Sequence, residues 1–470
     1  MVAWLPWLAF SALLLQVGGI SASSVQIGRS LIASYYENSD ALPGVVVLGD
    51  MLMPQDLYLH LTSDSNSSRK GVSLTNFLWP SENGQPTVPY LFKDKKYKEE
   101  ILHGMRHWEE HTCIRFREAT DDDQNSLSFV KEKSCWSYVG KQEERTQKIS
   151  IGDGCQQLKT VVHEIGHALG LFHEHMRPER DDFLYINESN ILQTNWEQFE
   201  KINTTVVDGR GVKFDYTSIM HYSGLDFSSN GRLTMATTEP RHQGLLGRAE
   251  GLTHRDKLLV NHMYGCIDKW TACCSLTDNY CKGDGYVGRN CLCVCPPGTE
   301  GDLCQKQKGD YYSNMMPACS QVIVKEMTFT SPQYPRPIPT DTWCVYKVQA
   351  PPGKVVEVTF RHFHVSKTSS KWPWRCQNAF LEIRESGLYD GEMFCDKDIK
   401  TNQSFVSTSR IMILYLDVLL PGSKGFTADV KFFKASNPPM EKPGGAGGLR
   451  SQLWLQVCFL FVVYLTHSLM

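Results

Sequence analysis

Three histidines and one glutamate, in the stretch HEIGHALGLFH, have the types and spacing of a metal-dependent hydrolytic site. His163 and His167 are four residues apart, so on a helix both imidazoles face one point. Gly170 can end that helix with a sharp turn, because glycine turns the chain without steric cost. The turn can bring back His173 as a third ligand. Three neutral imidazoles and one open position are typical of a catalytic zinc site, so we predict one zinc ion here.

Glu164 lies between the first two histidines and is placed to take a proton from zinc-bound water rather than to bind the metal. A bare HExxH motif also occurs on ordinary amphipathic helices. The extension by a glycine and a third histidine removes most such chance matches and is the metzincin signature. A metzincin also needs a methionine turn, and the sequence SIMHY around Met220 supplies one.

Two details narrow the family. Glu174 follows the third histidine directly, within HEHMRPERD, and Tyr222 stands two residues after Met220. Together these motifs resemble the astacin family of zinc endopeptidases from about residue 70 to 267. Matrix metalloproteinases and adamalysins carry other residues at both places. The resemblance implies that Tyr222 is a switchable zinc ligand that stabilises the tetrahedral intermediate. It also implies that Glu174 contacts the buried new N-terminus after activation, while Met220 forms an apolar floor under the histidines.

The composition points to a secreted protein of about three domains. The chain has 470 residues and a net charge of −3, which argues neither for nucleic acid nor for an anionic membrane surface. Its 16 cysteines begin at Cys113 and cluster downstream, as expected of a disulfide-bonded extracellular chain. Four glycosylation sequons agree with that compartment: Asn66, Asn187, Asn203 and Asn402.

The N-terminal region is expected to be removed in two steps. Residues 1–23 have the apolar core and small residues of a signal peptide; a type II membrane anchor is the alternative, for which the apolar run is short. Residues 24–70 are expected to be a propeptide. There, VLGDM resembles the inhibitory F-x-G-D motif of astacins, with valine for phenylalanine. Asp50 would occupy the zinc position that water needs, and Gly49 lets the backbone pass close; an ordinary Gly-Asp turn is the alternative.

A polar stretch that ends in Arg69 and Lys70 is a site for cleavage by a trypsin-like or furin-like protease. The mature protease domain would then span residues 71–267. We expect helices over 97–111, 187–201 and 254–263, and a short strand over 149–152.

His103, His107 and His111 recur every four residues on the first of these helices. Their spacing suits a metal, but we interpret them as a solvated or packed helix face, because a better ligand set lies elsewhere.

The astacin resemblance implies an α+β metzincin fold. A mixed sheet and the zinc helix form its upper lobe, and a mostly irregular or helical lower lobe follows. It also pairs Cys113 with Cys266 and Cys135 with Cys155, a connectivity that spacing alone cannot establish.

Two further modules follow. Residues 269–305 resemble a disulfide-rich EGF-like module, with Cys295–Cys304 as one expected bridge. This region holds seven cysteines, so one of the adjacent Cys273 and Cys274 is left over for an unusual bridge, an interchain bond or a free thiol. Residues 319–434 resemble a CUB domain, an all-β sandwich. Its expected disulfides are Cys319–Cys344 and Cys376–Cys395. Ala379 stands where many CUB domains carry a calcium-binding aspartate, which puts calcium binding in doubt.

The chain ends in a Pro/Gly-rich linker, residues 435–452, and an apolar tail, residues 453–470. Small residues, a spacer and an apolar terminus resemble a GPI-attachment signal, with Gly444 or Gly445 as attachment site. A tailless transmembrane helix is the alternative. Either reading predicts an extracellular protein held at the cell surface.

The sequence therefore predicts a zinc-dependent endopeptidase of astacin type, made as a zymogen. It would act on extracellular, egg-coat or matrix proteins, and its CUB and EGF-like modules would bind protein partners. The alternative is a catalytically silent adhesion or matrix-binding protein that uses those modules. A different metzincin is a second alternative, against which SIMHY and Glu174 argue.

Overall fold

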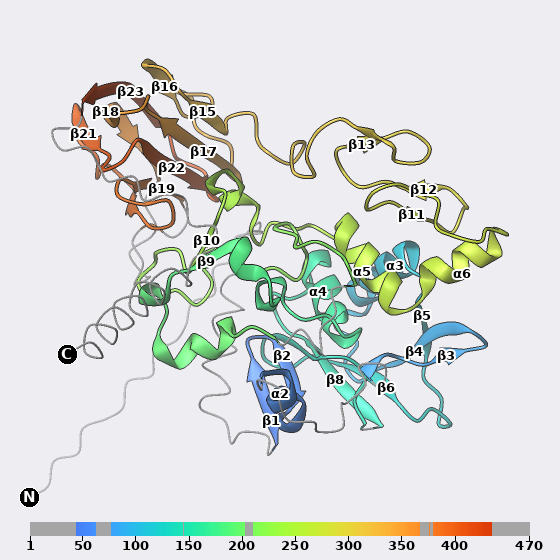
Figure 1. Cartoon of the computed structure of the whole chain (residues 1–470). Coiled ribbons are helices and arrows are strands. Elements are labelled where there is room, and N and C mark those ends of the chain that lie inside the picture. The colour runs from blue at the N-terminus through green and yellow to red at the C-terminus, as the bar shows by residue number, and fades with distance from the viewer. Residues whose placement is uncertain are drawn as a thin grey trace, which may run out of the picture.

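The computed structural model describes residues 44–62, 77–143, 145–202, 210–366, 376 and 379–434. It arranges them as a two-lobed body, a small disulfide-bonded segment and a C-terminal β-sandwich (Figure 1). The expected signal peptide, the Arg69–Lys70 cleavage site and the C-terminal linker and tail lie outside these residues. No helix within these ranges is long and apolar enough to cross a bilayer.

The upper lobe, residues 77–143 and 145–170, is built on a mixed sheet. The order of its strands, with the N-terminal segment included, is β1-β2-β7-β8-β6-β4-β3, and β5 pairs with β4. Its strands are β1 (Val45–Leu48), β2 (Met51–Pro54), β3 (Ser81–Glu82), β4 (Gln85–Phe92), β5 (Arg115–Glu118), β6 (Ser126–Val130), β7 (Cys135–Tyr138) and β8 (Thr146–Ile151). The strand expected over 149–152 is the end of β8.

Two helices, α3 (Lys98–His111) and α4 (Leu158–Ala168), pack together in this lobe. Gly104 allows their close crossing, because a Cβ there would lie 2.5 Å from the Val161 side chain. Trp108 is fully buried between them and donates from its indole nitrogen to Val162 O at 3.1 Å. The helix expected over 97–111 is thus confirmed, and its apolar face forms the core of the upper lobe.

The N-terminal segment, residues 44–62, adds a hairpin and a short helix, α2 (Gln55–Thr62), to one edge of the sheet. Strand β2 pairs in parallel with β7. Ser137 N donates to Asp50 O at 2.9 Å and Val139 N donates to Leu52 O at 3.0 Å. The segment therefore uses backbone donors of β7 that would otherwise line an open sheet edge.

The lower lobe, residues 171–202 and 210–265, has little regular structure. It contains 3-10 helices and one short antiparallel pair of strands: η2 (Glu174–Met176), η3 (Arg180–Asp182), η4 (Glu188–Asn190), η5 (Gln193–Phe199), η6 (Pro240–Leu245), β9 (Leu184–Ile186) and β10 (Met235–Thr237). Helices α5 (His254–Met263) and α6 (Cys266–Cys273) close it. The helix expected over 254–263 is confirmed.

The single helix expected over 187–201 is wrong. The structure has two 3-10 stretches there, separated by extended backbone at Leu192. Polar side chains here form one local and one distant hydrogen bond: Ser189 Oγ donates to Asn187 Oδ1, and Asn190 Nδ2 donates to Leu233 O of the neighbouring chain segment. Such residues are weak helix formers.

Seven disulfides hold the described chain. Cys113–Cys266 and Cys135–Cys155 lie in the two-lobed body, and Cys319–Cys344 and Cys376–Cys395 lie in the sandwich. Between them, a segment with four short strands carries three bridges: Cys274–Cys291, Cys281–Cys293 and Cys295–Cys304. Its strands are β11 (Tyr286–Val287), β12 (Cys293–Val294), β13 (Thr299–Glu300) and β14 (Lys306–Gln307). Cys273 is left as an exposed free thiol.

The C-terminal sandwich packs a five-stranded sheet on a four-stranded one. The first has the order β15 (Gln321–Ile323), β17 (Thr342–Gln349), β22 (Ile411–Val418), β19 (Ala379–Arg384), β20 (Glu392–Phe394). The second has the order β16 (Met327–Thr330), β23 (Gly425–Lys434), β18 (Lys354–His364), β21 (Gln403–Val406).

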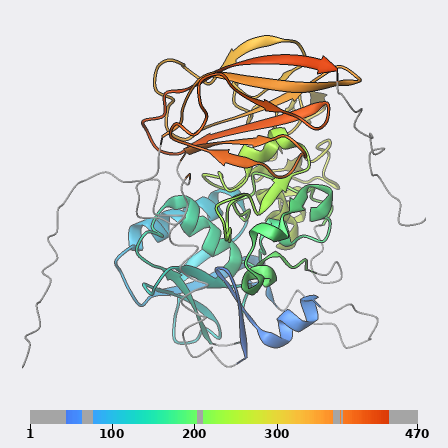
Figure 2. The same cartoon turned by 90° about the vertical axis from the view of Figure 1, so that its left-hand side faces the viewer.

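The five-stranded sheet is buried on both faces. Its inner residues, such as Leu414, form the core of the sandwich. Its outer residues, such as Trp343 and Phe380, join one apolar cluster with side chains of the lower lobe. The two views show this sheet lying against the lower lobe around η6 and β10 (Figures 1 and 2). The sandwich is therefore docked on the body.

Candidate active site

Helix α4 and the turn after it present the first two histidines. The helix ends at Ala168, and Gly170 follows with a φ of +101°, a left-handed conformation that suits glycine. Gly166 faces the methionine turn, because a Cβ there would lie 2.9 Å from Met220 Sδ. Met220 is buried and thus packs directly against the helix that carries the histidines.

The three histidines meet at one buried point. His163 Nε2 and His167 Nε2 lie 3.0 Å apart. The outer ring nitrogens are held by backbone: His163 Nδ1 lies 2.7 Å from Ile219 O and His167 Nδ1 lies 2.8 Å from Leu171 O. A carbonyl oxygen can only accept, so each Nδ1 carries the proton. Each Nε2 then offers a lone pair to the shared point, as in protein zinc sites.

Asp50 of the N-terminal segment reaches the same point. Its carboxylate oxygens lie 2.8 Å from His173 Nε2, 3.4 Å from His163 Nε2 and 3.6 Å from His167 Nε2. Burial acts to raise the pKa of Asp50, but the facing imidazoles lower it well below its usual value. The structure thus brings together all four residues that the sequence suggested as zinc ligands in the uncleaved chain.

The donor set fits a zinc ion. His173 Nε2 and Asp50 Oδ1 are buried and form no hydrogen bond, although four potential ligand atoms lie within 4.8 Å of one another. Burial lowers the pKa of His173 to about 3, which keeps the imidazole neutral as a metal ligand must be. Buried acceptors that converge without donors are explained by a cation between them.

Glu164 and Tyr222, the two other residues expected to act in catalysis, border this centre. Glu164 is buried on α4 between the two histidines. The Tyr222 ring lies 4.1 Å from the His173 ring and 4.5 Å from the His175 ring, between centroids. His175 was missed by the sequence reasoning. Its position two residues after His173 in the sequence could have pointed to it. Its stacking on Tyr222, however, can be seen only in the folded structure.

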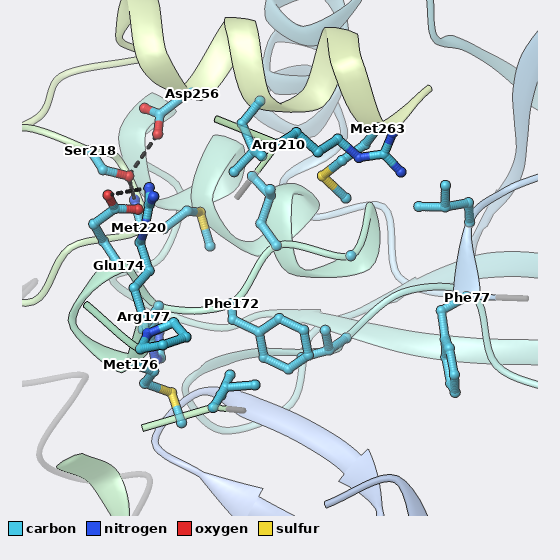
Figure 3. Close-up of a pocket in the computed structure, with 18 of the residues that line it drawn as sticks. Phe77, Phe172, Glu174, Met176, Arg177, Arg210, Ser218, Met220, Asp256 and Met263 are labelled. Carbon is cyan, nitrogen blue, oxygen red and sulfur yellow. Dashed lines mark hydrogen bonds and ion pairs between the residues drawn. The ribbon is translucent and has the colours of Figure 1, made fainter. Parts of the chain in front are cut away.

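Glu174 lies beside the centre in a buried ion pair. Its carboxylate receives Arg177 Nη1 at 3.0 Å and Asp215 N at 2.7 Å. Burial raises the pKa of Glu174 to about 7, against the opposing effect of Arg177. A mostly apolar pocket opens next to this pair, and Phe77, the first described residue after the expected cleavage site, lines it (Figure 3).

The methionine turn is fixed by Asp256, which sequence reasoning also missed. Ser218 Oγ donates to Asp256 Oδ1 at 2.6 Å, and Ile219 N donates to Asp256 Oδ2 at 3.0 Å. Because Ile219 O receives His163 Nδ1, the carboxylate of Asp256 helps to hold the carbonyl that orients a metal ligand.

The histidine stripe on α3 belongs to the packing of that helix. His107 Nε2 accepts from Leu252 N at 3.2 Å, and the His107 and His111 rings are 4.7 Å apart. Among the described residues, His103, His107 and His111 are in no cluster with metal-ligand geometry.

The expected glycosylation sites differ in surroundings. Asn402 is exposed in a turn. Asn187 is buried and accepts from Ser189 Oγ, which disfavours a bulky glycan. Asn66 and Asn203 lie outside the described residues.

A centre of three histidines with a neighbouring glutamate, set between two lobes, has the ligand set that is typical of catalytic zinc sites. Residues 74–265 match the family model of astacin, peptidase family M12A, and residues 319–429 match the CUB domain. The chain thus carries an astacin domain, the catalytic domain of a zinc metalloendopeptidase, together with a CUB domain. Zinc is the cofactor of this domain.

Proteins with similar sequences include proteases and a zinc metalloproteinase by name. Blastula protease 10 of Paracentrotus lividus is 34% identical over 397 residues, which cover 81% of this chain and 64% of that protein. Protein SpAN of Strongylocentrotus purpuratus is 33% identical, over 81% of this chain and 62% of that protein. Zinc metalloproteinase nas-23 of Caenorhabditis elegans is 28% identical, over 87% and 77%. The chain spans less than two thirds of the length of the first two.

Proposed function

We propose that this protein is an extracellular zinc endopeptidase that is made as a zymogen and hydrolyses internal bonds of extended protein segments. The observation that carries the proposal is the convergence of His163, His167 and His173 at one buried point next to Glu164. A catalytically silent adhesion protein would not need to keep this set intact. Seven disulfides among the described residues support an oxidising, extracellular compartment.

The three histidines would hold the zinc ion. A zinc ion held there would polarise a carbonyl and lower the pKa of a bound water towards neutral pH. Glu164 takes the proton of that water and later delivers it to the leaving amine nitrogen. Tyr222 donates its hydroxyl to the oxygen that gains negative charge, once the tyrosine has turned from its resting place.

Strand β7 supplies the binding edge for substrate. In the uncleaved chain, Ser137 N of this strand and Val139 N just after it donate to Asp50 O and Leu52 O of the N-terminal segment. Removal of the N-terminal segment frees these donors for an extended substrate strand, which explains binding by main-chain atoms of many sequences. The substrate is therefore an unfolded or loop segment of an extracellular protein.

Activation requires the loss of Asp50 from the centre. A cut after Arg69 or Lys70 by a trypsin-like or furin-like protease separates the segment from the mature domain. The new N-terminus then has about six residues before Phe77, a reach of roughly 20 Å, and Phe77 already lines the pocket beside Glu174. We propose that the terminal amine pairs there with the Glu174 carboxylate, which Arg177 holds in the zymogen.

The cysteine-rich segment 269–305 is proposed as an EGF-like module, since three disulfides replace a hydrophobic core in it. Tethering to the cell surface through residues 453–470 also stays a proposal. Both the CUB domain and this segment are candidates for binding protein partners.

The test is cleavage of a terminally blocked peptide library by the full chain after brief trypsin treatment. We expect internal cuts that a zinc chelator abolishes and that added zinc restores. Glu164→Gln is the matched control: it keeps zinc and lowers the rate by about 10²–10⁴. A processed, zinc-loaded chain that makes no cuts would favour the adhesion protein. Near-normal turnover by Glu164→Gln would refute the assigned base.

A further inference from the structure

Two tyrosines from outside the astacin domain are buried in its lower lobe. Tyr311 and Tyr312 lie between the cysteine-rich segment and the CUB domain, outside both expected modules, yet each is only 9% exposed. The Tyr311 hydroxyl donates to Asp215 Oδ2 at 3.0 Å. The Arg255 guanidinium lies 3.8 Å from the centre of the Tyr311 ring, a cation–π contact.

Asp215 connects this tyrosine to the start of α5. Its Oδ2 also accepts from Thr253 Oγ1 at 2.9 Å. Thr253 is the N-cap of the helix and forms a capping box with Asp256, whose backbone nitrogen donates to Thr253 Oγ1 at 3.1 Å. The position of the Asp215 carboxylate therefore bears on the capped first turn of α5.

The same turn reaches the metal centre. Asp256 accepts from Ser218 Oγ and from Ile219 N, and Ile219 O receives the Nδ1 proton of His163. A second connection between Asp215 and the metal centre runs through the backbone. Asp215 N donates to the carboxylate of Glu174, the residue next to His173. A chain of buried and partly buried hydrogen bonds thus runs from Tyr311 to a metal ligand.

Docking of the CUB domain keeps this segment in place. The Trp343 ring covers Gly244 so closely that a Cβ would not fit between them. Arg248 of the astacin domain pairs with Asp417 of the CUB sheet at 2.6 Å. These contacts hold the CUB domain, which follows Tyr311 in the sequence, on the lower lobe. The segment that carries Tyr311 is therefore fixed on that lobe as well.

We propose that Tyr311 is a positioning residue of the zinc centre, acting through Asp215, so that the functional peptidase unit extends beyond the astacin domain into the segment before the CUB domain. Its hydroxyl fixes Asp215 Oδ2, and Asp215 in turn fixes the capped turn that holds the methionine turn behind His163. The inference rests on the proposed peptidase function for its kinetic test, but the metal centre can be read directly.

The neighbouring tyrosine offers a matched control. Tyr312 has the same exposure, and its hydroxyl accepts from Arg255 Nη1 at 3.0 Å and from Tyr216 N at 3.1 Å and donates to Phe214 O at 3.3 Å. It donates to none of the carboxylates in the chain just described. Tyr311→Phe and Tyr312→Phe each remove one buried hydroxyl and keep a ring, and Tyr312→Phe loses more hydrogen bonds, so a change found only in Tyr311→Phe would not come from a general loss of stability. Only the first should alter the metal centre.

The experiment uses the full chain after activation, with cobalt(II) in place of zinc. Tyr311→Phe should change the visible cobalt spectrum, weaken zinc binding about threefold to tenfold, and lower kcat more than it raises KM. Groups that contact a ligand directly cost about 10–100-fold, and Tyr311 is further removed. Tyr312→Phe should keep the wild-type spectrum and zinc affinity. Asp215→Asn should reproduce the change, and Tyr311→Phe should add little to it.

The results of these variants distinguish a positioning role of Tyr311 from a purely structural one. A wild-type cobalt spectrum and zinc affinity in Tyr311→Phe, or the same change in both tyrosine variants, would make Tyr311 a plain structural anchor and overturn the proposal. If Tyr311→Phe is not secreted, Asp215→Asn with a wild-type spectrum overturns it as well. If the wild-type chain binds zinc but cleaves nothing, the proposed peptidase function fails, while the spectra still test Tyr311.

Discussion

Gly49 of the N-terminal segment passes so close to the hydroxyl of Tyr222 that a Cβ would not fit between them. Gly49 also has a φ of +65°, in the left-handed region. The glycine before Asp50 therefore has two roles: it turns the backbone, and it makes room for the tyrosine proposed to act in catalysis. The blocked state holds Tyr222 against the same segment that carries Asp50.

Gly49→Ala should weaken the block. A methyl group at this position meets both the hydroxyl of Tyr222 and an unfavourable φ, a combined cost of about 2 kcal/mol or more. We expect the uncleaved chain to gain about thirtyfold in peptide-hydrolysis activity, measured before any trypsin treatment. Gly44→Ala is the control, since Gly44 has a φ of +78° but no neighbour within 4 Å of its would-be Cβ. Equal gains in both variants would attribute the effect to strain alone.

Asp50→Asn should open the centre without proteolysis. The amide carries no charge and binds zinc more weakly than a carboxylate, so water can compete for the position. The uncleaved variant should show at least about a tenth of the activity of the trypsin-treated wild type, and a chelator should abolish it. Asp56→Asn, at an exposed position of α2, should stay inactive until cleavage. A silent Asp50→Asn chain that trypsin still activates would mean that bulk, not the carboxylate, blocks the site.

The zinc centre was predictable because it depends on short-range geometry. A spacing of four residues places His163 and His167 on one face of a helix. Gly170, with its positive φ, then turns the chain so that His173 reaches the same point. The helices over 97–111 and 254–263 were predictable for a similar reason, since each carries a clear periodicity or cap.

Features that depend on distant partners were not predictable. Tyr311 and Asp215 are 96 residues apart, and neither residue type reveals the other as its partner. The 3-10 stretches around Asn190 likewise depend on a backbone carbonyl 43 residues away. The sequence does indicate that one sheet of the CUB domain is covered on its outer face. In β22 the segment IMILYLDV is apolar at nearly every position instead of alternating, as expected of a strand buried on both faces.

Acid should destabilise the fold at His254, a buried residue of α5 that contacts the cysteine-rich segment. His254 Nε2 lies 2.7 Å from Asp284 O, and burial lowers the pKa of His254 below 6.5. The unfolded chain therefore takes up this proton first as the pH falls. The stability that the neutral ring contributes is present above about pH 6.5 and is lost below it. Thermal unfolding at pH 7.5 and 5.5 should show a smaller loss for His254→Gln than for the wild type.

An exposed histidine controls for this experiment. His103 lies on the solvent side of α3, so His103→Gln should keep the wild-type loss of stability between the two pH values. If His254→Gln and His103→Gln behave alike, the buried ring is not a source of the acid sensitivity.

The docking of the CUB domain depends on Arg248, whose guanidinium pairs with Asp417 and also with Asp341. Both Arg248 and Asp417 are largely buried, with side-chain exposures of 21% and 11%. Removal of the arginine leaves Asp417 with only the Tyr415 hydroxyl, at 2.6 Å, as its side-chain hydrogen-bond donor among the described residues. A hydrogen-bonded charge at such a site contributes about 2 kcal/mol.

Arg248→Ala should therefore lower the first unfolding midpoint by about 4 °C and speed proteolytic cleavage between the astacin and CUB domains. Arg361→Ala is the matched control. Its partner, Asp429, lies at the same 2.6 Å, but this pair is on the other sheet of the sandwich and Arg361 is 52% exposed. An exposed pair contributes about 0–1 kcal/mol, so this variant should unfold near the wild-type temperature and keep its resistance to proteolysis. Equal shifts in the two variants would show that the domains are not held together through Arg248.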